Sequence, residues 1–161
     1  MESVREQLQI FTRRFGLLNA SCCDECCGEQ VSMAQSHILF EVRRSESPSM
    51  QVVAEELGMD VTTFSRQAKT LEAKGLIFRR VSADDRRVAL LGLTETGRQV
   101  MEKIDLYMAG RLEMVFAGMS DFERETVVRS LGLLNEALNQ TVQGAAHREG
   151  TIACCKLKKV R

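Results

Sequence analysis

A chain of 161 residues, 44% hydrophobic and 27% charged, is long enough to form one globular domain with its own core. No apolar stretch approaches the roughly 20 residues of a membrane-spanning helix, and the N-terminal segment lacks the apolar core of a signal peptide. We therefore expect a cytoplasmic protein without a membrane partner, and the net charge of zero by itself argues weakly against nucleic-acid binding.

The first predicted element is an amphipathic helix over residues 4–18. A narrow apolar seam runs along it, because its large apolar residues alternate at spacings of four and three: Val4, Leu8, Phe11, Phe15 and Leu18. Such a seam is typical of a helix that packs against a partner.

The cysteines follow in an unusual arrangement, because all six occur as adjacent pairs. They are Cys22, Cys23, Cys26 and Cys27 in a loop over residues 21–28, and Cys154 and Cys155 near the C-terminus. On a helical turn several of these thiolates would converge, and soft ligands of this kind suit As(III), Cu(I), Cd(II), Hg(II) or Zn(II). There are two alternatives: the thiols are reversibly oxidised to disulfides, or they are inert.

A helix over about residues 32–44 is expected next. His37 lies on it next to Ile38 and Leu39, a pattern more typical of a core or capping histidine than of a metal ligand. His147, near the C-terminus, is a weaker candidate ligand.

Residues 49–75 predict two short helices separated by a glycine. Ser49 can cap the first, which buries Met50, Val53, Ala54 and Leu57 and stops at Gly58. Asp60 can cap the second, whose inward stripe is Val61, Phe64, Ala68 and Leu71. Its opposite face carries side chains that can reach base edges in a DNA major groove: Thr62, Thr63, Ser65, Arg66, Gln67 and Lys69.

Two strands, residues 76–81 and 88–93, are predicted after Gly75, joined by a polar turn with arginines at its tip. A hairpin directly after a helix-turn-helix is typical of a wing that lays cations along phosphates or into a minor groove. From Asp60 to Arg98 there are eight Lys and Arg residues against five Asp and Glu, so this region is basic within a neutral chain.

Two further helices and a tail complete the chain. Thr94 can cap a helix over residues 95–118 that links two lobes, with Val100, Ile104, Tyr107, Met108, Leu112 and Val115 inward. Ser120 and Glu123 form a capping-box pattern before a helix over 120–143, whose seam is Val127, Leu131, Leu134 and Leu138. Residues 144–161 form a basic segment expected to be flexible.

Five motifs in order and with characteristic spacing resemble the MarR family of bacterial transcription regulators. They are VAEELG (53–58), TFSR (63–66), LEAKGLI (71–77), DDRR (84–87) and LTETGR (93–98). The resemblance implies a mainly α fold with a winged helix-turn-helix lobe over residues 31–98 and a small β-hairpin wing. It also implies a homodimerisation lobe made from the terminal helices, residues 1–30 and 120–143.

The same resemblance implies residue roles at the DNA. The homodimer would bind a pseudo-palindromic operator with one recognition helix per half-site and one wing per side. Asp85 resembles the carboxylate that holds the wing arginine, and Arg87 resembles the arginine inserted in the minor groove. Arg86 occupies a variable position and is expected at a phosphate.

The cysteine loop lies between the predicted dimer helix and the helix that supports the DNA-binding lobe, so a bound ion there could change the spacing of the recognition helices. We therefore predict a repressor released from DNA by a soft metal or metalloid. The alternatives are a thiol-oxidation sensor, a regulator that binds a small aromatic ligand, and a metal-buffering or chaperone protein. The chain lacks the histidine pair after the wing that zinc-responsive members use. No phosphate loop or catalytic histidine motif indicates an enzyme.

Overall fold

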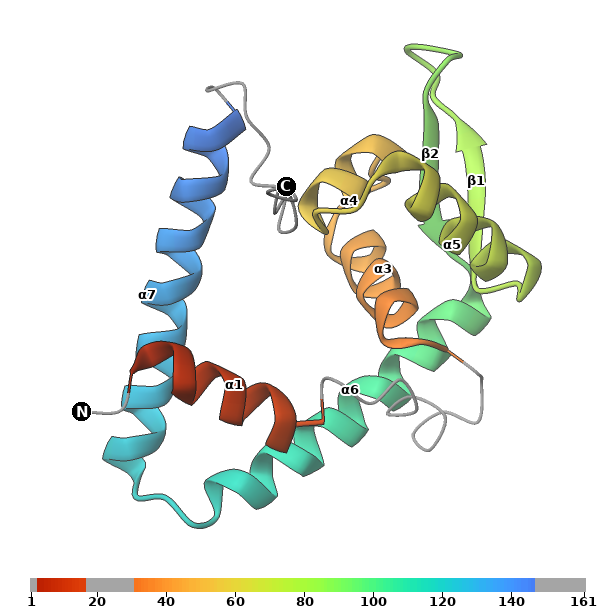
Figure 1. The fold of residues 1–161 in the computed structure, drawn as a ribbon. Coiled ribbons are helices and arrows are strands. Elements are labelled where there is room, and N and C mark those ends of the chain that lie inside the picture. Colours follow the sequence, from red (N-terminus) through yellow and green to blue (C-terminus); the bar gives the residue numbers. More distant parts are fainter. Residues whose placement is uncertain (1–2, 17–30, 147–161) are drawn as a thin grey trace, which may run out of the picture. The chain divides into compact units, whose positions relative to one another are not determined.

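The computed structural model describes residues 3–16 and 31–146. Within these ranges lie six helices and two strands (Figure 1): α1 (Val4–Arg14), α3 (Met33–Arg44), α4 (Met50–Glu56), α5 (Val61–Ala73), β1 (Ile77–Val81), β2 (Ala89–Leu93), α6 (Glu95–Phe116) and α7 (Asp121–Ala146). The mainly helical fold with one small hairpin is therefore confirmed. The chain divides into two compact units, Met1–Arg111 and Leu112–Arg161. None of the described helices is long and apolar enough to cross a membrane.

Helix α1 is shorter than predicted. It ends at Arg14, because Gly16 takes the left-handed conformation (φ 82°) that reverses the chain direction at a helix end. Leu18, expected in the seam, lies outside the described residues. The end of α1 is held to α6, since Arg111 donates from Nη2 to the Phe15 carbonyl (2.7 Å) and lies 5.1 Å above the Phe15 ring.

The helix-turn-helix forms as its caps and glycines predict. Ser49 accepts a hydrogen bond from the Val52 amide at the start of α4 (3.2 Å). Gly58, with φ 60°, allows the chain to turn between α4 and α5. The start of α3 carries a reciprocal capping box between Ser32 and Gln35.

The core of the first unit is built from α3, α4, α5, the hairpin and the first half of α6. From α5, it contains Phe64, Ala68 and Leu71, all fully buried. Val61 was also predicted to face inward, and this is wrong: 63% of it is exposed. It is the first helical residue of α5, and no other described element covers its position on the stripe.

The hairpin is antiparallel, with a register that pairs Ile77 with Leu93 and Val81 with Ala89. Each strand is one residue shorter than predicted. Leu76 lies before β1 but is fully buried, and its carbonyl accepts from the Thr94 amide at 3.1 Å. This contact fixes the start of α6 against the beginning of the wing.

Helix α6 buries Val100, Met101 and Ile104. The predicted inward stripe is wrong in its second half, because Leu112 and Val115 are exposed, Val115 by 49%. Periodicity identified the apolar side of this helix but not how far the core of the single chain extends along it.

In the second unit, the predicted capping box opens α7. Glu123 accepts from the Ser120 amide (2.8 Å), and Ser120 Oγ accepts from the Glu123 amide (3.4 Å). The helix continues to Ala146, so residues 144–146, predicted as the start of a flexible tail, are helical. Large apolar side chains along α7 are exposed, among them Leu131 (48%), Leu134 (39%) and Leu138.

Candidate nucleic-acid interface

The first turn of α5 is held by a charged cap. Asp60 Oδ1 accepts from the Thr63 backbone amide at 2.9 Å. Hydrogen bonding by the Thr63 side chain and amide lowers the pKa of Asp60, and the nearby Arg66 cation contributes in the same direction. A carboxylate is well placed here because the N-terminal end of a helix carries partial positive charge. The Thr63 hydroxyl, predicted to contact DNA, is therefore also a partner of the cap.

The outward side of α5 presents most of the predicted DNA contacts. Its buried stripe lies against the core, and Thr62, Thr63, Arg66 and Lys69 on the other side are exposed. Ser65 and Gln67 are only half-buried, at the margin between the two sides. The hydroxyls in the first turns of the helix can donate hydrogen bonds to base edges, and the cations further along can bind phosphates.

Gln67 has a protein partner as well. Its Oε1 accepts from Gln35 Nε2, on α3, at 3.0 Å. The sequence pattern did not reveal this pair, because the two residues are far apart in the chain and both are polar. Gln67 as a DNA contact remains a prediction.

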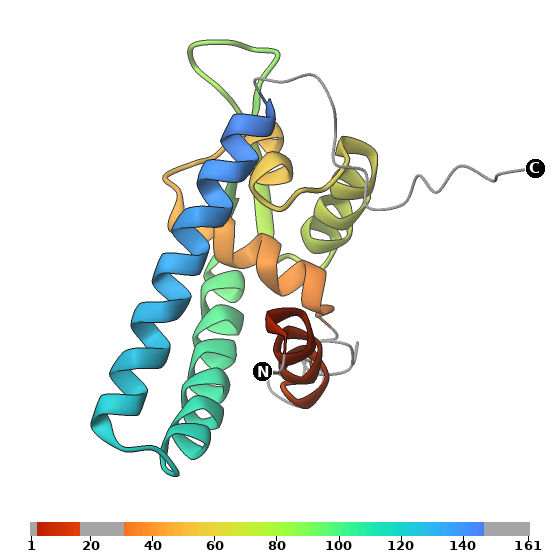
Figure 2. The ribbon, with the colours of Figure 1, turned by 60° about the vertical axis from the view of Figure 1, so that its left-hand side comes forward.

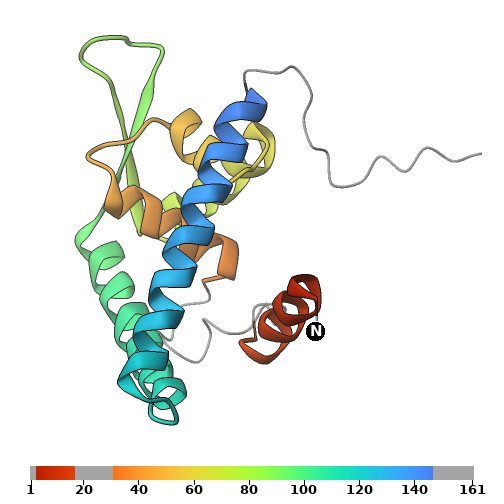
Figure 3. The ribbon, with the colours of Figure 1, turned by 90° about the vertical axis from the view of Figure 1, so that its left-hand side faces the viewer.

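The tip of the wing is ordered by local hydrogen bonds. Asp85 Oδ1 accepts from the Arg87 backbone amide (2.9 Å), and the Asp85 carbonyl accepts from the Val88 amide (2.9 Å). Asp85 thus holds the main chain of Arg87, whereas the resemblance implied that it holds the arginine. Neither Arg86 nor Arg87 forms an ion pair within the described residues, and both are exposed. Figures 2 and 3 show the tip standing clear of the helices of its own unit.

The other cations of the hairpin region are committed to the protein. Arg79 Nε lies 3.1 Å from Glu72 Oε2, and Arg80 donates to Ser47 Oγ at 2.6 Å. Arg98 pairs with Glu95 (2.8 Å) and also donates to a backbone carbonyl. Lys74 lies against Gln35 (3.5 Å). Four of the eight basic residues have exposed side chains that form neither an ion pair nor a hydrogen bond within the described residues: Arg66, Lys69, Arg86 and Arg87. They lie on α5 and at the wing tip.

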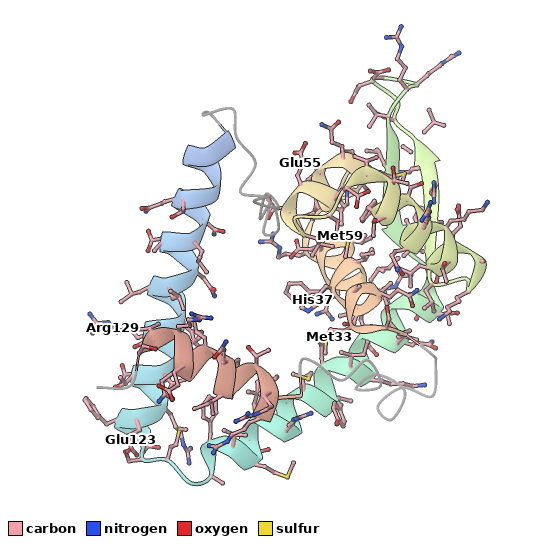
Figure 4. All side chains as sticks on the ribbon, viewed as in Figure 1. Met33, His37, Glu55, Met59, Glu123 and Arg129 are labelled. Atoms are coloured by element: carbon pink, nitrogen blue, oxygen red, sulfur yellow. The ribbon has the colours of Figure 1, made fainter. Side chains whose placement is uncertain are left out.

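The predicted cysteine site lies outside the described residues, since it comprises Cys22, Cys23, Cys26, Cys27, Cys154 and Cys155. His147 lies outside them too. Among the residues that are described, no group of three or more His, Cys, Asp or Glu side chains could hold a metal ion. His37 is exposed, so its interpretation as a core histidine is wrong. In Figure 4 it points to the same side of α3 as Met33.

Comparisons with known proteins agree with this geometry. The sequence model of the MarR family matches residues 29–88, which run from just before α3 to the wing tip. The uncharacterized HTH-type transcriptional regulator YxaD of Bacillus subtilis (strain 168) is 35% identical over 137 residues, covering 85% of this chain and 94% of YxaD.

Solved structures share the fold. FabT of Streptococcus pneumoniae, in a crystal structure with DNA, superimposes with a TM-score of 0.74 at 23% identity, over 86% of this chain and 96% of FabT. A MarR transcriptional regulator from Methanosarcina mazei Go1 gives 0.74 at 21% identity, over 87% and 99% of the two chains. The family consists of regulators and not enzymes. With these motifs, this fold and a relative at this level of identity, the chain belongs to the MarR family of DNA-binding transcription regulators.

Proposed function

We propose that this protein is a homodimeric repressor that binds a pseudo-palindromic operator through α5 and the wing. The observation that carries the proposal is the distribution of unpaired positive charge. Arg66 and Lys69 on α5, and Arg86 and Arg87 at the wing tip, are exposed and without an ion pair among the described residues. Phosphate neutralisation by such cations supplies much of the affinity of a protein for DNA.

Base recognition would come from the first turns of α5. Thr62, Thr63, Ser65 and Arg66 carry donors of the length that reaches base edges in the major groove. FabT, which shares this fold, has been crystallised with DNA, and this supports placing the same elements at DNA here.

A homodimer is supported by apolar surface that is exposed in the described part of the chain. In α1, Val4, Leu8 and Phe11 are exposed. In α7, exposed large apolar residues recur along the helix, and Leu131 and Leu134 belong to its predicted seam. Burying such a side chain contributes roughly 1.5–3 kcal/mol, so a second subunit covering these seams would be strongly favoured.

The effector that we propose is a soft metal or metalloid ion, held by Cys22, Cys23, Cys26 and Cys27, with Cys154 and Cys155 as further ligands. Support comes from the donor set itself, since three or four thiolates suit As(III), Cu(I), Cd(II), Hg(II) or Zn(II). The pairing of all six cysteines also favours a second candidate, in which oxidation of the thiols releases the DNA.

The experiment begins with DNA selected from a random-sequence duplex library by the reduced protein. Bound DNA is then titrated with each ion and, separately, with peroxide and with a small aromatic acid. Release by about one ion per subunit, absent from a variant with Ser at all four loop cysteines, would support the metal sensor. A variant with Ser only at Cys154 and Cys155 tests the contribution of the tail.

The other outcomes separate the alternatives. Release by peroxide alone would replace the ion with thiol oxidation, and release by the aromatic acid alone would remove the cysteines from the signal. Failure of the wild-type protein to select any DNA sequence would refute the proposed operator binding itself.

A further inference from the structure

Gln35 is a buried polar residue whose side-chain amide forms hydrogen bonds through both its oxygen and its nitrogen. Only 6% of the residue is exposed. Its Oε1 accepts from the Ser32 backbone amide at 3.2 Å and from Lys74 Nζ at 3.5 Å, while its Nε2 donates to Gln67 Oε1 at 3.0 Å. A buried amide without partners would destabilise the fold, so these hydrogen bonds hold the Gln35 side chain in one position.

These contacts join three places in the first unit. Ser32 caps the start of α3, Gln67 lies in the middle of α5, and Lys74 directly follows α5. Gln67 also lies directly between Arg66 and the buried Ala68, so it is fixed in the same turn as an exposed cation.

The apolar stripe of α5 packs the helix against the core and limits its rotation, although apolar attraction is not itself directional. A hydrogen bond is directional and weakens steeply when its angle or length changes. The Gln35–Gln67 pair therefore adds a directional constraint on the rotation and axial position of α5 relative to α3.

We propose that Gln35 is a positioning residue for DNA recognition, which acts through Gln67 to orient the base-contacting side of α5. The inference rests on the proposed placement of α5 in the major groove. It also changes the role predicted for Gln67, which would orient its neighbours and not read a base itself.

The test is a double-mutant cycle with Gln35→Met, Gln67→Met and the double variant. Methionine keeps the length and bulk of glutamine but cannot form the amide pair. Gln99→Met is the matched control, since Gln99 is exposed on α6 and its side chain bonds only weakly to Glu95, at 3.5 Å. Each protein is titrated with a duplex selected by the wild type and with a scrambled duplex of equal composition.

We expect each single variant to lose about fivefold or more in affinity for the selected duplex, the order of one lost hydrogen bond. Gln35→Met also removes the bonds to Ser32 and Lys74, but the double variant should lose no more than the larger single effect, since the shared pair can be broken only once. Affinity for the scrambled duplex should be unchanged, as should binding of either duplex by Gln99→Met. Stoichiometric titration gives the active fraction, so that partial unfolding is not counted as weaker binding.

Three results would overturn the inference. Losses that multiply in the double variant would show that Gln35 and Gln67 act independently. A loss in Gln67→Met with none in Gln35→Met would return Gln67 to direct base contact. Equal losses on both duplexes would show a general structural effect. A wild-type protein that selects no sequence would instead refute the proposed function, which keeps the two failures distinct.

Discussion

Replacing Arg87 by Ala tests the assignment of the wing tip to DNA. The Arg87 side chain is exposed and its backbone amide is held by Asp85, so Ala keeps the turn and removes only the cation. A dimer presents two wings and would lose two such cations. Each cation that neutralises a phosphate makes the negative slope of log K against log salt steeper by about 0.9, so the magnitude of the slope should decrease by about 1.8 in the variant.

This change in slope gives a measurable difference. When salt is raised from about 50 to about 200 mM, a slope difference of about 1.8 means that the affinity of the wild type falls by a factor roughly 12 times larger than that of the variant. The assay is fluorescence anisotropy with the selected duplex at four or five salt concentrations. Wild-type binding should weaken roughly 12-fold more than variant binding across that range.

Arg98→Ala is the matched control, because it removes the same charge from the same chain. Arg98 is already paired with Glu95 and donates to the Leu93 carbonyl, so we expect its cation to contribute less to DNA binding than that of Arg87. Its salt slope should remain close to that of the wild type. Equal slopes for the two variants would refute the reasoning, because total charge and not its position would then determine binding.

Three further predictions concern stability and assembly. Gly97→Ala should lower the free energy of unfolding by about 1–3 kcal/mol in chemical denaturation, because the new Cβ would overlap the Leu76 carbonyl; Gly110→Ala, with open space at its Cβ, should not destabilise the fold. Asp60 has a lowered pKa through its Thr63 bonds, so its stabilising effect is present above the unfolded pKa of about 4 and is lost as pH falls through the folded value. Wild type should therefore lose stability relative to Asp60→Asn in an acid titration of unfolding, and parallel curves would contradict the cap. Leu134→Glu should shift the protein toward monomer in light scattering while Leu133→Glu, off the seam, should not; a dimeric Leu134→Glu variant would remove the seam from the interface.

Much of the fold could be predicted because its signals are local. Ser49 and Asp60 satisfy free amides within three residues of themselves, and Gly58 allows a turn at its own position. Such effects depend on neighbours in the chain, so they are visible in the sequence. The polar turn between two short apolar stretches and the family motifs predicted the wing in the same way.

The same local signals could not predict how deeply a side chain is buried or which charged side chains form ion pairs. Val61 continues the apolar stripe of α5 yet is exposed, because periodicity assigns a side of a helix and not the extent of the surface that covers it. Arg79 and Arg87 are equivalent in a count of charges, but one is paired with Glu72 and the other is exposed at the tip.

The sequence by itself therefore determined the elements, their order, the family and the basic region that we propose faces DNA. Only the tertiary structure decided which cations in that region remain unpaired and that Gln67 bonds to Gln35 across two helices. The physical reason is that caps and turns are satisfied within a few residues, whereas ion pairs and buried hydrogen bonds depend on segments brought together by packing of the core.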